Sequence, residues 1–105
     1  MSIIQSKHNS GGKESTSNME YNESLSKALR DKILANSKGG RPEMVKRHQE
    51  RGKLLARDRI EELIDSDTPF LEFSPLAAYG LYNDEVPSAG IVTGIGVVNG
   101  REVMI

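Results

Sequence analysis

Hydrophobic residues recur at helical spacing between Glu23 and Asn36. They lie three or four positions apart and would share one face of a helix: Leu25, Ala28, Leu29 and Ile33. The Asn22 side chain can cap the first turn, and Gly39-Gly40 stops the run. The sequence therefore predicts a helix from Glu23 to about Asn36 with one apolar stripe.

Two shorter helices are predicted after the glycine pair. Pro42 suits the first position of a helix that runs until Gly52 interrupts it. A further helix from Arg57 to about Ile64 places its apolar residues on one side and pairs Arg57 with Glu61 one turn later. A segment rich in turn-forming residues, 65–69, follows.

The last third of the chain changes from helical to extended spacing. Residues 70–73 alternate as a short strand, and Gly90–Val98 is rich in Ile and Val. Asn99-Gly100 separates that run from residues 101–105, and this dipeptide is typical of a two-residue hairpin turn of type I′. The sequence predicts a β-hairpin at the end of the chain.

Gly90, Gly94 and Gly96 do not form a dinucleotide-binding loop. Their spacing differs from G-x-G-x-x-G, and they lie between strands rather than between a strand and a helix. Glycines inside a strand indicate a bulge or a close approach of another group to the backbone, which is the interpretation we favour.

The order of these elements predicts an α/β fold in which helices precede a β-hairpin. Residues 1–21 have few apolar side chains and are expected to be a disordered leader. A two-stranded hairpin is marginally stable by itself, and its second strand runs to Ile105 without a polar cap. Residues 22–105 are therefore expected to be the incomplete N-terminal part of a larger domain, cut inside a sheet.

Composition narrows the classes of function. With 14 Lys and Arg against 15 Asp and Glu, the net charge of −1 does not favour a nucleic-acid partner. The sequence has no cysteine, no apolar run of the roughly 20 residues that a membrane span needs, and no secretory h-region. Its first twenty residues contain no Arg, unlike a mitochondrial presequence. We expect a cytoplasmic protein with no membrane partner.

Basic residues are concentrated between Arg41 and Arg59. The members are Arg41, Lys46, Arg47, Arg51, Lys53, Arg57 and Arg59. Such groups bind phosphate well, although a solvated helical face with local ion pairs explains the same charges. No triad, carboxylate pair or P-loop can be assembled, and His48 lacks neighbours at metal-ligand spacing, so neither a catalytic residue nor a metal site is predicted.

The segment from His48 to Ile60, HQERGKLLARDRI, resembles the leading segment of carboxyltransferase subunits of biotin-dependent acyl-CoA carboxylases. Gly39-Gly40 precedes it, and Asp58 stands where the family usually has Glu. Several downstream segments are similar to the methylcrotonyl-CoA branch of that family in order and spacing: residues 63–65, 69–72, 79–82, 85–87 and 90–96. The resemblance spans about residues 28–105, and geranyl-CoA carboxylase is the nearest rival.

The resemblance implies the start of a crotonase-like spiral of ββα units. The complete subunit would move a carboxyl group from carboxybiotin to the γ-carbon of 3-methylcrotonyl-CoA, a ligase step of leucine degradation. Backbone N–H donors would stabilise the enolate oxygen, and in the family these donors lie further along the chain. Arg51, Lys53 and Arg57 are the residues that we expect to contact the phosphates of coenzyme A.

The resemblance also implies partners. A second subunit would carry biotin and use ATP to carboxylate it, and further copies of the carboxyltransferase would complete the active sites. Two alternatives stay open: a propionyl- or geranyl-CoA carboxylase of the same family, and a non-catalytic truncated or assembly fragment.

Overall fold

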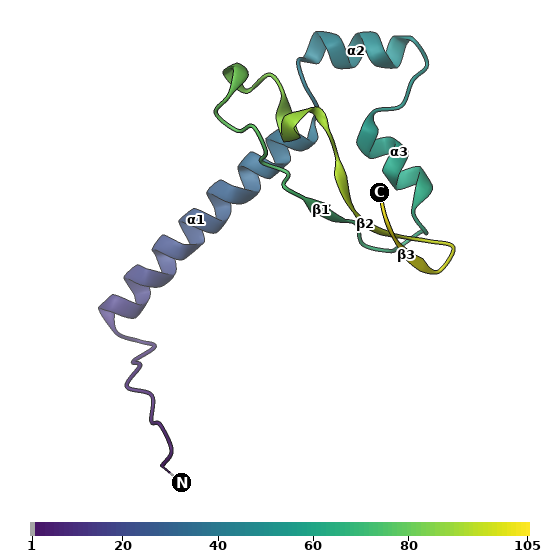
Figure 1. Ribbon diagram of the computed structural model, residues 1–105. Helices are drawn as coiled ribbons and strands as arrows, with labels where there is room; N and C mark the ends of the chain where they lie inside the picture. Colours follow the sequence, from purple (N-terminus) through teal and green to yellow (C-terminus); the bar gives the residue numbers. More distant parts are fainter. Residues whose placement is uncertain (1) are drawn as a thin grey trace. The chain divides into compact units, whose positions relative to one another are not determined.

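The computed structural model describes residues 2–105 (Figure 1). The chain divides into two compact units, one ending at Asp31 and the other comprising Lys32–Ile105. Among the described residues, no helix combines the length and the apolar character that a membrane span requires.

The helix α1, Lys13–Ser37, is longer than the sequence predicts. It begins at Lys13 rather than Glu23, so the disorder expected for residues 13–21 is wrong. Glu14 in the first turn favours the positive end of the helix dipole, and Lys27 pairs with Asp31 at 3.0 Å. These local interactions stabilise a helix that buries no residue. A prediction from the number of apolar residues does not include them. The division into a leader and a domain at residue 21 stays a prediction.

The two shorter helices are confirmed as α2, Pro42–Glu50, and α3, Ala56–Leu63. Pro42 lies in the first turn of α2, where its missing N–H costs nothing. Gly52 adopts a φ of 71°, and its N–H donates to the Gln49 carbonyl at 2.8 Å, which ends that helix. At the start of α3, the Asp58 carboxylate accepts a hydrogen bond from the Leu55 N–H at 3.3 Å.

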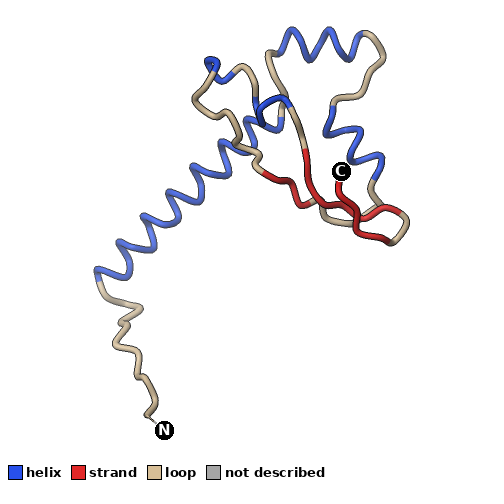
Figure 2. Tube along the Cα trace, in the orientation of Figure 1, coloured by secondary structure: helices blue, strands red, loops and turns tan. Residues whose placement is uncertain are grey.

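The predicted hairpin is confirmed as β2, Thr93–Val98, and β3, Arg101–Met104. Asn99 and Gly100 have φ values of 51° and 73°, as a type I′ turn requires. A third antiparallel strand, β1, Leu71–Phe73, pairs with β2 and gives the sheet order β1-β2-β3 (Figure 2). The strand predicted over residues 70–73 is thus confirmed, and its pairing with β2, which the sequence does not predict, adds a third strand to the hairpin. Two short 3-10 turns precede β2: η1, Tyr82–Asp84, and η2, Pro87–Gly90.

The close approach predicted for the strand glycines is confirmed at Gly94 and Gly96. A Cβ atom on Gly94 would lie 2.3 Å from the Leu71 carbonyl oxygen and 2.5 Å from the Phe70 ring. A Cβ atom on Gly96 would lie 2.7 Å from Cγ2 of Ile64, just after α3. The bare backbone of β2 thus lets these side chains pack directly on the sheet, beside the buried Ile60 of α3.

Candidate functional site

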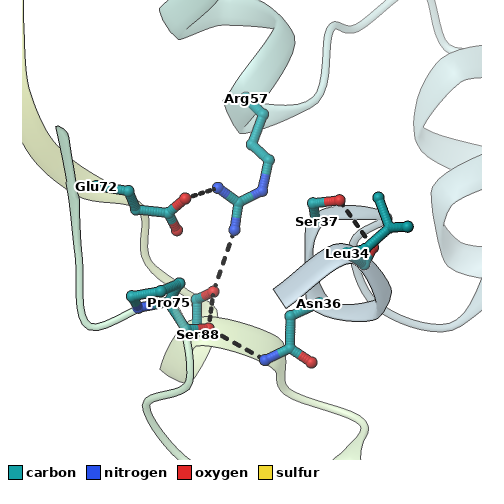
Figure 3. A network of polar contacts seen from close by, with 7 residues as sticks. All are labelled: Leu34, Asn36, Ser37, Arg57, Glu72, Pro75 and Ser88. Atoms are coloured by element: carbon teal, nitrogen blue, oxygen red, sulfur yellow. Dashed lines mark hydrogen bonds and ion pairs between the residues drawn. The ribbon is translucent and has the colours of Figure 1, made fainter. Parts of the chain in front are cut away.

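A polar cluster centred on Arg57 joins four segments of the Lys32–Ile105 unit (Figure 3). The Arg57 guanidinium pairs with the Glu72 carboxylate on β1 and donates to the Ser88 hydroxyl at 3.2 Å. The Ser88 hydroxyl donates in turn to the Pro75 carbonyl at 2.9 Å, and that carbonyl also accepts from the Asn36 side chain at 3.1 Å. We call these five residues the Arg57 cluster.

The Arg57 cluster is partly shielded from water. The side chains of Arg57 and Glu72 are 25% and 18% exposed, and Ser88 is buried. The second carboxylate oxygen of Glu72, Oε1, is buried, and it has no hydrogen-bond partner within residues 2–105. An ion pair in such surroundings is screened less than a surface pair, and removing one partner would leave the other charge uncompensated.

The cluster holds both ends of loop 74–90, the segment between β1 and the approach to β2. Seven of its non-glycine residues have positive φ: Ser74, Ala78, Tyr82, Asn83, Asp84, Ser88 and Ala89. Each such residue costs about 1–2 kcal/mol relative to a right-handed conformation. Inside the loop, the Ala89 N–H donates to the Ala77 carbonyl at 3.0 Å, and the Gly80 N–H donates to the Asp84 carboxylate at 2.6 Å. The conformation therefore depends on contacts that fix it.

Loop 74–90 forms one wall of a mainly apolar cavity of about 300 Å³. The opposite walls come from the end of α1 and the first turns of α2 and α3, with Val45, Leu55 and Ile91 among the lining residues. Glu85 at its edge pairs with the half-exposed Arg41. The cavity has the size of a small ligand pocket, and its shape depends on the course of the loop.

The structure separates the three predicted phosphate contacts by their surroundings. Arg51 and Lys53 lie in the exposed connection between α2 and α3, and among residues 2–105 neither side chain forms a hydrogen bond or an ion pair. His48 approaches that connection through Nε2, which lies 3.0 Å from the Leu54 carbonyl oxygen. Arg57 instead points to Glu72, which replaces the pair with Glu61 that the helical spacing predicts.

Sequence reasoning missed Glu72 and Ser88 as members of the site. Both are single polar residues, and no repeat or spacing links them to Arg57. The antiparallel pairing of β1 with β2 sets the position of Glu72, which lies opposite Gly94, and no local pattern in the sequence indicates this pairing.

The fold is similar to that of a solved carboxyltransferase subunit. The structure is similar to the crystal structure of the β subunit of Pseudomonas aeruginosa geranyl-CoA carboxylase, with a TM-score of 0.55 and 28% sequence identity. That alignment covers 96% of this chain and 19% of the solved chain. The predicted fold class is confirmed.

The family follows from the sequence comparison. The carboxyl transferase domain matches residues 47–105, which is more than half of the chain. The chain therefore belongs to the carboxyl transferase domain family, as its His48–Ile60 segment indicates.

Relatives with known names agree with this assignment. The chain is 53% identical over 77 residues to the Mycobacterium tuberculosis biotin-dependent 3-methylcrotonyl-coenzyme A carboxylase beta1 subunit, covering 73% of this chain and 15% of that protein. It is 45% identical over 89 residues to the mitochondrial methylcrotonoyl-CoA carboxylase beta chain of Arabidopsis thaliana, covering 85% and 15%. A propionyl-CoA carboxylase carboxyltransferase subunit of Haloferax mediterranei is 33% identical over 82 residues, covering 73% and 16%. The chain thus spans about 15% of the length of these relatives.

Proposed function

We propose that this chain is the N-terminal part of a carboxyltransferase subunit that transfers a carboxyl group from carboxybiotin to 3-methylcrotonyl-CoA, as in leucine degradation. The observation that carries the proposal is the difference in identity between two groups of relatives. Identity is 53% to a 3-methylcrotonyl-CoA carboxylase subunit and 33% to a propionyl-CoA carboxylase subunit over similar lengths. The likeness to geranyl-CoA carboxylase, at 28% identity, supports the same family at a greater distance.

The proposal includes partners and a location. Biotin would be carried, and ATP used, by a separate biotin-carboxylase and carrier subunit, while further carboxyltransferase copies would complete the active sites. A cytoplasmic location also belongs to the proposal, although the Arabidopsis relative is named as mitochondrial. Imaging of a fluorescent fusion in the source cells tests the location directly.

The exposed basic connection between α2 and α3 is the part of this chain that we propose for coenzyme A. Arg51 and Lys53 lie in an exposed segment, and neither pairs with a carboxylate in the part of the chain that the structure describes, so their charges are available to phosphate. Arg57, the third residue that the sequence predicts for this role, pairs with Glu72 and is not part of this proposal.

A segment exchange tests the proposed function. This chain would replace the corresponding segment of the Mycobacterium tuberculosis 3-methylcrotonyl-CoA carboxylase subunit and, in parallel, that of the Haloferax mediterranei propionyl-CoA carboxylase subunit. Each hybrid would be assembled with its own biotin-bearing partner, and carboxylation of its own acyl-CoA substrate would be measured. We expect activity near the parent level in the methylcrotonyl hybrid and at least a tenfold loss in the propionyl hybrid. Equal activity in both, or none in the methylcrotonyl hybrid, would contradict the proposal.

Charge reversal in the active hybrid tests the coenzyme A contacts. Arg51→Glu combined with Lys53→Glu is expected to raise the KM for acyl-CoA about tenfold with little change in kcat, because phosphate binding is lost while the reacting groups remain. Arg59→Glu is the matched control, since Arg59 is an exposed cation of the same basic segment that is not proposed as a contact. An unchanged KM in the double variant would assign Arg51 and Lys53 a structural role.

A further inference from the structure

We propose that Arg57 is a positioning residue: its guanidinium fixes the left-handed course of loop 74–90, and thereby one wall of the adjoining cavity, rather than binding a phosphate. The effect of Arg57 on the loop does not depend on the proposed acyl-CoA chemistry. Only the exclusion of a phosphate contact rests on the proposed function.

The position of Arg57 in α3 requires a nearby negative charge. Arg57 lies in the first turn of α3, where the helix dipole disfavours a cation. Its charge is compensated by Glu72 on β1, and the planar fork of the guanidinium lets a second nitrogen reach Ser88. A lysine ammonium has one charged nitrogen and cannot reproduce this fork.

The Glu72 carboxylate opposes phosphate binding at Arg57. A phosphate bound to Arg57 would compete with the Glu72 carboxylate, whose other oxygen is already buried without a partner. A phosphate would also bring a second anion close to that carboxylate. Both effects oppose phosphate binding at Arg57. Neither effect applies to Arg51, which is exposed and forms no ion pair within residues 2–105.

Ser88 connects Arg57 to both ends of loop 74–90. Ser88 has a φ of 54° and is buried, and its single hydroxyl accepts from Arg57 while donating to Pro75. Arg57 thus acts on the residue that ties the end of loop 74–90 to its beginning. The next residue, Ala89, also has a positive φ and donates its N–H to Ala77. The Ala89 amide therefore reports whether the loop retains this conformation.

Amide hydrogen exchange of this 105-residue chain, resolved by NMR, tests the inference. Arg57→Ala is expected to accelerate exchange of the Ala89 amide at least tenfold and to shift its resonance. The Asp65 amide, which donates to the Val97 carbonyl at 2.8 Å outside loop 74–90, is expected to exchange as in the parent chain. Arg57→Lys, which keeps the charge near Glu72, is expected to give an intermediate rate. Arg51→Ala is the matched control and is expected to change neither amide.

Three results would overturn the inference. They are an Ala89 amide that is unprotected in the parent chain, one that is unaffected by Arg57→Ala, and one that responds equally to Arg51→Ala. Should Arg57→Ala accelerate every amide alike, Ser88→Ala decides, because it removes both hydroxyl bonds and leaves the ion pair with Glu72. Acceleration confined to Ala89 and its neighbours supports the inference, and none at Ala89 overturns it.

The KM of the methylcrotonyl hybrid for acyl-CoA shows whether Arg57 contacts a phosphate, independently of its effect on loop 74–90. Arg57→Gln combined with Glu72→Gln, which removes the cation without leaving its partner charged, is expected to leave the KM for 3-methylcrotonyl-CoA within twofold, whereas the Arg51 and Lys53 reversals raise it. A tenfold rise for this double variant with an unchanged Ala89 amide would make Arg57 a direct contact and refute its positioning role. A hybrid without activity would count against the proposed function and leave the exchange result valid.

Discussion

The two faces of the three-stranded sheet are packed in opposite ways. On one face, Gly94 and Gly96 expose the backbone of β2, and Phe70 and Ile64 lie directly against it. On the other face, the paired residues Leu71, Ile95 and Met104 form an apolar row across all three strands. Leu71 and Met104 in that row are 61% and 69% exposed in the unit formed by residues 32–105. The stability of this unit is therefore expected to depend on the glycine face far more than on the apolar row.

Gly94→Val is expected to cause the largest loss of stability among the changes that test this difference between the faces. A Cβ atom at position 94 would meet the Leu71 carbonyl oxygen at 2.3 Å, and backbone cannot move away cheaply. Overpacking of this kind costs about 3 kcal/mol or more. We expect the free energy of unfolding, measured by denaturant titration with circular dichroism, to fall by at least that amount. A loss below 1 kcal/mol would mean that β1 does not lie against Gly94 as described.

Gly96→Ala is the next test on the same face. Its new Cβ atom would meet the ends of two side chains, Ile64 at 2.7 Å and Ile105 at 3.1 Å, and these can shift. We expect a loss of about 1–2 kcal/mol, because overpacking is partly relieved by side-chain movement and alanine restricts the unfolded chain. Gly100→Ala, with no neighbour within 4 Å but a φ of 73°, is the control that isolates backbone strain from packing.

How far the sequence predicts these features depends on the range of the interactions. The α2 and α3 helices and the hairpin turn follow from local signals such as Pro42, Gly52 and Asn99-Gly100, and all three are confirmed. The close approach at Gly94 is also predictable, because a glycine within a strand has few other uses. The pairing of β1 with β2 is not predictable in this way, since a three-residue strand joined by a long loop carries no local signal of its partner.

The candidate site follows the same division. Basic composition finds Arg51, Lys53 and Arg57, but it cannot distinguish an exposed cation from one directed to a carboxylate fifteen positions later. That distinction needs the register that places Glu72 near the start of α3. The early start of α1 at Lys13 was missed for another reason: the helix buries no residue, and its local support comes from charges such as Glu14 in the first turn and the Lys27–Asp31 pair rather than from apolar burial.

Asp65→Ala is expected to have a smaller effect than either glycine change in β2. The Asp65 carboxylate accepts hydrogen bonds from the backbone N–H groups of Asn99 and Gly100 at 2.8 and 2.7 Å. It thereby links the segment after α3 to the hairpin turn. Because these bonds are exposed to solvent, we expect their loss to cost about 1 kcal/mol. Asp65→Asn, which retains one acceptor oxygen, is expected to lose about half as much, and equal stability of all three proteins would show that the turn holds without this link.

The apolar row is expected to give the smallest change in stability. Leu71→Lys combined with Met104→Lys replaces two exposed side chains, so the free energy of unfolding is expected to change by less than about 0.5 kcal/mol at each position. The same substitutions are expected to reduce binding of a hydrophobic dye such as ANS, because they interrupt a contiguous apolar surface. Leu81→Lys is the matched control, since Leu81 is 56% exposed but lies in loop 74–90, away from the strands. A large loss of stability from the double substitution, absent in the control, would show that the row is packed in solution and that the two faces are more alike than the structure indicates.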